Sequence, residues 1–329
     1  MSQTQQVVDN FPEVTDPYRR ELLAHCYRMV GSVHDAEDLV QETYLRAWRA
    51  YHGFEGRSSV RTWLSRTATN TCLTALQSRG KRPLPSGLGA ASSDPDDPLV
   101  EQLEVPWLEP LPDALVADPG EAVAAREGIR LAFIAALQHL PPRQRAVLIL
   151  RDVLRWKAAE VAEALETTTT AVNSILQRAH AQLEQAAPSE NSVMEPVSAQ
   201  QRELLERYVT AFWEKDVATI VELLTTEAVW EMPPFDGWYR GAETIGRLIA
   251  QQCPGGRHDM RMLPTWANGQ PAFGLYMRGE DGQFRPFHLQ VLTLTADGVH
   301  HVAAFFDTAL FSTFGLPQSL PAGPLPVDA

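Results

Sequence analysis

The chain has 329 residues, 44% of them hydrophobic and 21% charged, which is an ordinary globular composition in a chain too long for one core. Its formal net charge of −13 argues against a histone-like or polybasic nucleic-acid binder. No apolar run approaches the roughly 20 residues of a membrane helix, and the N-terminal residues lack the layout of a signal peptide. The three cysteines, Cys26, Cys72 and Cys253, are too widely spaced to suggest disulfides or zinc. We therefore expect a cytoplasmic protein with no membrane contact, cofactor or metal.

The acidity is unevenly distributed along the chain. Residues 83–125 contain nine acidic residues, no Lys or Arg, and many prolines, which is typical of a linker. Residues 1–82 carry 11 basic and 9 acidic residues, and residues 126–185 carry 8 and 6. Residues 186–329 carry 9 basic and 17 acidic residues. Five segments are predicted: a module at 1–82, an acidic linker at 83–120, a module at 121–186, a linker at 187–197, and a third module at 198–329.

The first module is predicted to be a small bundle of helices. There is no proline between Tyr18 and Arg79, and apolar residues recur there at helical spacing. Ser32 and the acidic residues after it suit the start of a helix. The segments Asp35–Trp48 and Phe54–Asn70 closely resemble region 2 of extracytoplasmic-function (ECF) sigma factors of the sigma-70 family.

This resemblance implies a core RNA polymerase contact on the second helix. In the family an acidic helix face docks on a basic coiled coil of the polymerase, and here Asp38, Gln41 and Glu42 would supply that face. Trp48 extends an apolar stripe with Tyr44 and Leu45, so we predict that it is a core residue.

The resemblance also implies promoter −10 binding and melting by the segment after that helix. Arginines there alternate with aromatic residues, which suits single-stranded DNA because phosphates need neutralising and unstacked bases need flat surfaces. For Trp63, packing in the core remains an alternative to contact with a base. The predicted −10 residues are Phe54, Arg57, Ser58, Ser59, Arg61, Trp63, Arg66 and Asn70.

An apolar segment, Val105–Pro112, interrupts the acidic linker. Exposed linkers rarely carry a tryptophan without a docking site. Similar sigma factors with an extra C-terminal domain have a comparable motif, so we expect Trp107, Leu108 and Pro110 to dock the linker on the C-terminal module. Packing on the nearest helix is the alternative.

The second module is predicted to contain a helix-turn-helix. A helix from about Glu121 to Leu140 stops at two prolines, and a further amphipathic helix begins there. Trp156–Leu165 and Thr168–Leu183 then form a helix pair that resembles sigma region 4, with Thr168 as N-cap. Glu166 replaces the turn glycine common in the family. The predicted −35 residues are Thr169, Thr170, Asn173, Ser174, Gln177 and Arg178.

The third module is predicted to be α+β. Helical spacing from Leu204 to Leu224 is followed by a strand at Glu227–Met232, a helix at 242–251 and strands near 260–266, 272–277, 284–295 and 299–307 of an antiparallel sheet. Together with Met232–Gly241 this order resembles the SnoaL-like cone, whose pocket could be filled by side chains, sense a small-molecule ligand or retain catalysis. The residues expected near a pocket are Trp230, Asp236, Trp238, Tyr239, His288 and Asp307.

The sequence thus predicts a multi-domain protein with two all-α sigma domains followed by a SnoaL-like α+β cone. The expected function is that of an ECF sigma factor that binds core RNA polymerase, recognises and melts promoter DNA, and is tuned in cis by the C-terminal domain, with no catalysis of its own. The alternative is a SnoaL-like ligand-binding protein or enzyme whose helical half tethers it to DNA.

Overall fold

The computed structural model describes residues 11–56, 58–78, 80–89, 92–116, 128–186 and 198–322. Arg57 and the predicted linker at 187–197 lie outside these residues. The chain forms two compact units. Residues up to 82 and from 108 to 191 belong to the first unit, and residues 83–107 and those from 192 onward belong to the second. The predicted linker at 83–120 is therefore divided between the units after Trp107.

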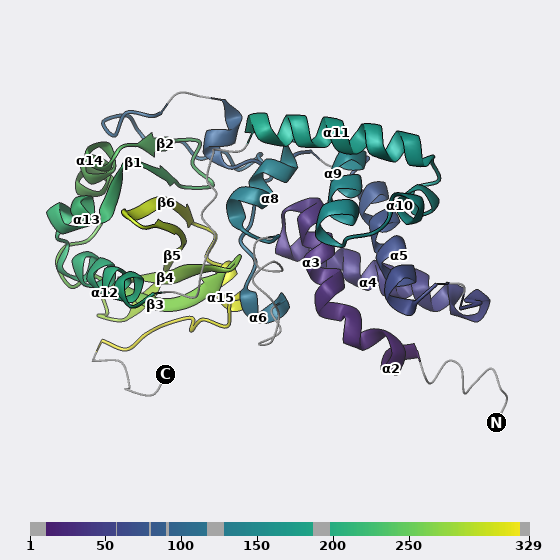
Figure 1. The fold of residues 1–329 in the computed structure, drawn as a ribbon. Helices are drawn as coiled ribbons and strands as arrows, with labels where there is room; N and C mark the ends of the chain where they lie inside the picture. Colours follow the sequence, from purple (N-terminus) through teal and green to yellow (C-terminus); the bar gives the residue numbers. More distant parts are fainter. Residues whose placement is uncertain are drawn as a thin grey trace. The chain divides into compact units, whose positions relative to one another are not determined.

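The first unit is helical throughout its described residues (Figure 1). Its helices are α2 (Phe11–Thr15), α3 (Arg19–Val30), α4 (Val33–Ala50), α5 (Val60–Ala75), α6 (Asp113–Val116), α8 (Leu131–Gln138), α9 (Pro142–Leu148), α10 (Ala158–Ala164) and α11 (Thr169–Ala186). A π-helical turn, Ile149–Val153, continues α9, and 3-10 turns lie at Asp16–Tyr18 and Tyr51–Gly53. The helix expected from about Glu121 begins at Leu131 within the described residues.

Short polar residues fix the helix boundaries of the first three-helix bundle. Gly31 ends α3 with φ of 71°, a left-handed conformation that glycine adopts without strain. The Ser32 hydroxyl then accepts a hydrogen bond from the Asp35 amide and starts α4. Ser59 caps α5 in the same way through the Thr62 amide. The core between α3, α4 and α5 contains the fully buried Leu22, Tyr27, Val40, Leu64 and Cys72.

The helix-turn-helix forms from α10 and α11 as predicted. The Thr168 hydroxyl accepts a hydrogen bond from the Ala171 amide at 3.2 Å, which makes it the N-cap of α11. Glu166, in the turn, has φ of 50°, so this position adopts the left-handed conformation. A glycine would adopt it without strain. Val172 and Ala179 on α11 are fully buried, and Val172 packs with Val161 and Leu165 in one cluster.

The second unit is a six-stranded sheet with longer helices against one face and a short C-terminal helix against the other (Figure 1). Its helices are α12 (Ala199–Glu214), α13 (Val217–Leu223), α14 (Ala242–Gln252) and α15 (Leu310–Thr313). Its strands are β1 (Leu224–Glu231), β2 (Trp238–Arg240), β3 (Met260–Ala267), β4 (Gln270–Arg278), β5 (Phe284–Thr295) and β6 (Gly298–Phe305). Tyr208 and Phe212 of α12, Ile220 of α13 and Ile245 of α14 share one core cluster with Trp230 and Leu292 of the sheet.

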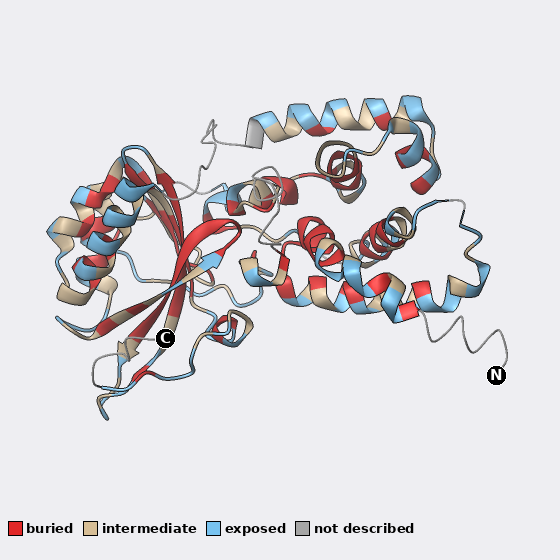
Figure 2. Cartoon of the chain, turned by 60° about the horizontal axis from the view of Figure 1, so that its bottom comes forward, coloured by how far each residue is buried: buried red, intermediate tan, exposed pale blue. Residues whose placement is uncertain are grey.

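The strand order is β2-β1-β6-β5-β4-β3. The expected hairpins are present; β3 and β4 join through Asn268 and Gly269, which both have positive φ, as a two-residue turn requires. The predicted antiparallel arrangement of β3, β4, β5 and β6 is confirmed. The strand β1 joins this sheet in parallel, beside β6. That pairing joins strands about 70 residues apart in the sequence. No hairpin turn connects them, so the sequence carries no local signal that predicts the pairing. Figure 2 shows that the strands are largely buried.

Candidate functional site

The exposed side of α4 combines acidic, amide and apolar side chains. Asp38 and Gln41 are exposed, and Glu42 is half-buried with its carboxylate accepting from Arg46 Nε at 2.7 Å. Leu45 and Trp48 follow at helical spacing and are 51% and 47% exposed. The prediction that Trp48 is a core residue is therefore wrong.

The reason for this error is that α4 carries two apolar stripes. Leu39, Val40 and Ala47 form the stripe that is buried in the bundle. Leu45 and Trp48 lie on another side, beside the carboxylates. We name Asp38, Gln41, Glu42, Leu45 and Trp48 the α4 face. An exposed tryptophan on a helix face that also carries charged groups is typical of a protein-binding surface.

The predicted −10 residues lie in the segment before α5 and along α5 as far as Asn70, apart from Arg57, which lies outside the described residues. Trp63 is half-buried and packs on Phe54, with ring centroids 4.8 Å apart and planes inclined by 32°. Tyr51 adds a third ring 6.3 Å from Trp63. The ring thus has packing partners in the free protein and remains partly accessible, and its contact with a base stays a prediction.

The cations and polar groups of this surface have partners of their own. Arg61 Nε donates to both carboxylate oxygens of Glu21 at 2.8 Å. Arg66 Nη1 lies 3.5 Å from Glu163 Oε1 of α10. Ser58 and Asn70 are exposed, while Ser59 is occupied as the α5 N-cap. Exposed ion pairs of this kind are weak, so little free energy is needed to break them.

The predicted −35 residues share the accessible side of α11. Thr169, Thr170, Asn173, Gln177 and Arg178 are exposed. Ser174 is half-buried and donates its hydroxyl to the Thr170 carbonyl oxygen at 3.0 Å. Figure 2 shows exposed residues running along this helix. Hydroxyl, amide and guanidinium groups on one helix face suit contacts to base edges and phosphates in a major groove.

The linker residues 83–107 run across the second unit. The Ser86 amide donates to Glu231 Oε2 at 2.7 Å, and the Ser93 amide donates to the Trp238 carbonyl at 2.7 Å. Arg247 of α14 is paired with Asp94 and Asp96. We name residues 83–107 the strap.

Sequence reasoning missed Glu231, which anchors the strap. Glu231 is 2% exposed, and its Oε1 lies 2.7 Å from His301 Nε2. Burial alone would raise the pKa of Glu231, but hydrogen bonds from His301 and Ser86 hold it below its usual value, so the carboxylate stays charged. An acidic residue at the end of a strand pattern gave no signal of this role.

The strap reaches the loop where pocket residues were predicted. Gln102 Nε2 donates to Asp236 Oδ2 at 3.1 Å, and the Gln102 amide donates to the Pro234 carbonyl at 2.8 Å. Trp107 Nε1 donates to the Gln102 carbonyl at 3.0 Å. Trp107 belongs to the second unit, and its hydrogen bond goes to Gln102 of the same linker, so its docking on the C-terminal module stays a prediction. Leu108 and Pro110 belong to the first unit and are buried.

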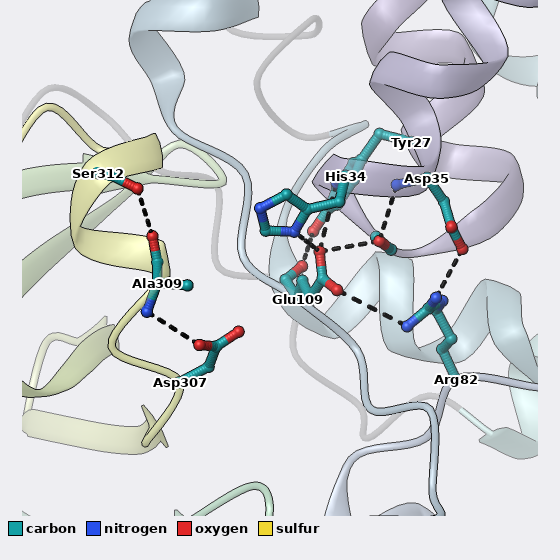
Figure 3. Close-up of polar contacts among 9 residues, drawn as sticks. Tyr27, His34, Asp35, Arg82, Glu109, Asp307, Ala309 and Ser312 are labelled. Carbon is teal, nitrogen blue, oxygen red and sulfur yellow. Dashed lines mark hydrogen bonds and ion pairs between the residues drawn. The ribbon is translucent and has the colours of Figure 1, made fainter.

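The six predicted pocket residues have different surroundings. Trp230 and Tyr239 belong to the hydrophobic core cluster. Asp307 is exposed and caps the α15 turn, with Oδ1 accepting from the Ala309 amide at 2.9 Å (Figure 3). Trp238 and Asp236 hold the strap. A hollow of about 340 Å³ in this unit lies elsewhere, against α12 and α13, and is lined by Glu203, Glu206, Arg207 and Glu214, among others.

His288 is the one predicted pocket residue with a buried polar network. Its Nε2 lies 2.8 Å from Gln290 Nε2, and Tyr208 Oη donates to Gln290 Oε1 at 2.9 Å. Burial lowers the pKa of His288 to about 3, so the imidazole is neutral at physiological pH. Its contacts are otherwise to the rings of Phe287 and Phe306.

Among the described residues, none of the helices is long and apolar enough to cross a membrane, and no group of three or more His, Cys, Asp or Glu is placed to hold a metal ion.

Known proteins share this organisation. Sigma-70 region 2 matches residues 15–82, and Sigma-70 region 4 matches residues 130–183. The ECF RNA polymerase sigma factor SigG of Mycobacterium tuberculosis is 61% identical over 315 residues, covering 94% of this chain and 85% of that protein. SigJ of the same organism is 29% identical over 309 residues, covering 88% of this chain and 89% of SigJ.

The crystal structure of Mycobacterium tuberculosis SigJ covers 92% of this chain and 98% of its own, with a TM-score of 0.59 and 24% identity. That likeness supports the fold, two helical sigma domains followed by an α+β domain. The match extends over most of the length of these relatives, which are sigma factors. It therefore favours the hypothesis of an ECF sigma factor over that of a ligand-binding protein or enzyme tethered to DNA. The chain belongs to the ECF RNA polymerase sigma factors of the sigma-70 family.

Proposed function

We propose that the α4 face binds core RNA polymerase, that the start of α5 binds and melts the promoter −10 element, and that the exposed side of α11 binds the −35 element. The observation that supports this assignment best is Trp48, which is 47% exposed and lies about two to three turns beyond Asp38 and Gln41 on the same side of α4. A tryptophan ring that is half exposed in the free protein gains free energy when a protein partner covers it. The acidic groups further along the same face suit a basic partner surface.

The aromatic and basic residues of α5 suit a different ligand. Phe54 and Trp63 present flat rings, and Arg61 and Arg66 present guanidinium groups within the same few residues. Unstacked bases can replace ring-to-ring contacts, and phosphates can replace Glu21 and Glu163. Single-stranded DNA fits this chemistry better than a duplex does.

The second unit is proposed to tune this activity in cis by holding the strap. The strap connects to the sigma domains at both of its ends, so its path on the second unit limits how those domains extend. A buried, charged Glu231 at Ser86 and the ion pairs of Arg247 fasten it. Catalysis is not part of the proposal, because Trp230 and Tyr239 are packed in the core and Asp307 serves as a cap. We propose the cytoplasm as its compartment because core polymerase acts there.

The assignment is tested by run-off transcription with purified core polymerase and the full chain. Arg247→Glu reverses the charge that pairs with Asp94 and Asp96, so it should release the strap, speed its cleavage by a protease and raise transcript yield. Arg240→Glu is the matched control, because Arg240 pairs with Glu227 of the same unit through its side chain. Equal transcript yields and equal cleavage rates for the two variants would refute tuning by the strap. Failure of the unaltered chain to support any core-dependent transcript would refute the sigma assignment.

A further inference from the structure

A short segment just beyond the strap, Leu108–Pro112, packs on the first unit where α3 ends and α4 begins. Leu108 and Leu111 are fully buried, and Pro110 and Pro112 are buried beside them. The Glu109 amide donates to the Gly31 carbonyl at 3.0 Å, and Tyr27 Oη donates to the Glu109 carbonyl at 2.7 Å. The segment is thus held through both its side chains and its backbone.

The Glu109 carboxylate is the polar anchor of this segment (Figure 3). Its Oε2 accepts from Ser32 Oγ at 2.8 Å and lies 3.0 Å from His34 Nδ1, while Oε1 lies 3.8 Å from Arg82 Nη1. Arg82 is itself paired with Asp35 at 2.6 Å. The carboxylate therefore sits at the N-terminal end of α4, where the helix dipole also favours a negative charge.

Region 4 meets the same point of region 2. A methyl group placed on Gly31 would lie 2.9 Å from Leu108 Cδ1 and 3.0 Å from Gln138, so region 2, Leu108 and α8 are in close packing there. Arg145 of α9 is 2% exposed and donates to the Met29 carbonyl at the end of α3 and to Gln138 Oε1. Burial lowers the pKa of Arg145 to about 10, which still leaves it charged.

This packing keeps the two predicted DNA-binding surfaces close together. Arg66 of the −10 surface lies 3.5 Å from Glu163, on the helix that precedes α11. Promoter elements centred near −10 and −35 are about 25 base pairs apart, which is about 85 Å along B-DNA. The 18 residues of α11 span only about 27 Å. Regions 2 and 4 must therefore separate before both elements are bound.

We propose that Leu108–Pro112 is an intramolecular latch whose docking surface on region 2 consists of Tyr27, Gly31, Ser32, His34 and Arg82, and which keeps region 4 closed on region 2 until Glu109 leaves. The inference rests on the proposed roles of α5 and α11 and adds the contact that must break before they act. The surface fits an extended peptide with one carboxylate between apolar residues, and Leu-Glu-Pro-Leu-Pro is its occupant in the free protein.

The latch is tested by measuring a distance in the free, full-length chain without polymerase. Spin labels are attached at Arg49→Cys on α4 and Glu184→Cys on α11, both exposed positions, in a Cys253→Ser background; Cys26 and Cys72 are buried. Glu109→Arg places a cation beside Arg82 and removes the acceptor for Ser32. The ratio of closed to open molecules should fall roughly 10- to 100-fold, as for the loss of hydrogen bonds to a charged group. Tyr27→Phe should give a smaller shift in the same direction.

The matched control is Glu104→Arg, the same charge change at an exposed residue of the strap. An unchanged distance distribution in Glu109→Arg, with the helical circular dichroism of the unaltered chain, would overturn the latch. So would equal opening by Glu104→Arg, because the effect would then be one of linker charge. A shift toward open molecules in Glu109→Arg but not in Glu104→Arg supports the latch. Since no polymerase is present, this result stands apart from transcription, whose failure would count only against the sigma assignment.

Discussion

Helices α4 and α11 have the same length and opposite exposed chemistry. Each spans 18 residues and begins with a hydroxyl N-cap, Ser32 or Thr168. The exposed side of α4 carries Leu45 and Trp48 among acidic groups, whereas that of α11 carries threonines, amides and Arg178. Apolar surface gains free energy when a protein partner covers it, while polar groups gain little unless a ligand offers matching hydrogen bonds. The difference separates a surface for protein from a surface for DNA within one fold.

The largest effect should come from Trp48→Ala on α4. We expect the dissociation constant for core polymerase to rise at least about 30-fold, corresponding to the roughly 2 kcal/mol or more that a tryptophan hot spot contributes. The melting temperature should change little, because the ring is 47% exposed in the free protein. Fluorescence-detected titration with core polymerase and a thermal melt check both expectations.

Trp266→Ala is the matched control for this variant. Trp266 lies on β3 in the other unit and is 45% exposed. It removes the same side chain at nearly the same exposure. A similar loss of core binding in both variants would show that α4 has no special role and would break the comparison between the two helices.

The sequence shows why Trp48 was harder to place than the helix that carries it. Helical periodicity, Ser32 and Thr168 predicted α4 and α11 correctly, because backbone hydrogen bonding and capping are local. A helix with two apolar stripes buries only one in its own bundle, and the choice depends on packing against α3 and α5. Spacing alone therefore assigned Trp48 to the core.

Contacts between distant segments account for the remaining differences. Glu109 binds Ser32 across 77 residues, and β1 pairs with β6 in parallel across a similar separation. No local pattern encodes either contact. The residues of the −10 and −35 surfaces, by contrast, lie within single turns and helices, so local sequence motifs were enough to locate them. Their roles remain predictions.

The second largest effect is expected from Asn173→Ala on α11. Asn173 is exposed on the side of the helix proposed for the major groove, and an amide can read one base edge. Losing it should weaken binding of the holoenzyme to its preferred −35 sequence by about 1–3 kcal/mol and relax preference at one position. Binding to a scrambled −35 sequence should stay the same. Equal weakening on both sequences would assign Asn173 to phosphate contact instead.

A smaller and different effect is expected from Arg178→Ala. Arg178 is exposed near the middle of α11, where a guanidinium suits a phosphate rather than a base. Binding should weaken to a similar extent on every −35 sequence, and the slope of log K against log salt should fall by about 1. Salt titrations of holoenzyme binding measure this slope. Arg202→Ala, at an exposed residue near the start of α12, should leave the slope unchanged.

The smallest effect concerns the turn before α11. Glu166 has φ of 50°, a conformation that costs a non-glycine residue about 1–2 kcal/mol. Glu166→Gly removes that strain but adds chain entropy to the unfolded state, so we expect a net gain of about 0.5–1 kcal/mol in the free energy of unfolding. DNA affinity should not change, because the substitution leaves the exposed groups of α11 in place. Chemical denaturation measures the gain.

Glu163→Gly, three residues earlier and inside α10, should have the opposite sign. Glu163 is exposed in the helical part of the motif, where glycine costs about 1 kcal/mol. A destabilisation by both variants would mean that the left-handed turn is not strained by Glu166. Opposite signs would locate the strain at the backbone of Glu166 alone. They would show that a glutamate in place of the family's turn glycine lowers the stability of the fold and leaves the DNA-facing side of α11 unchanged.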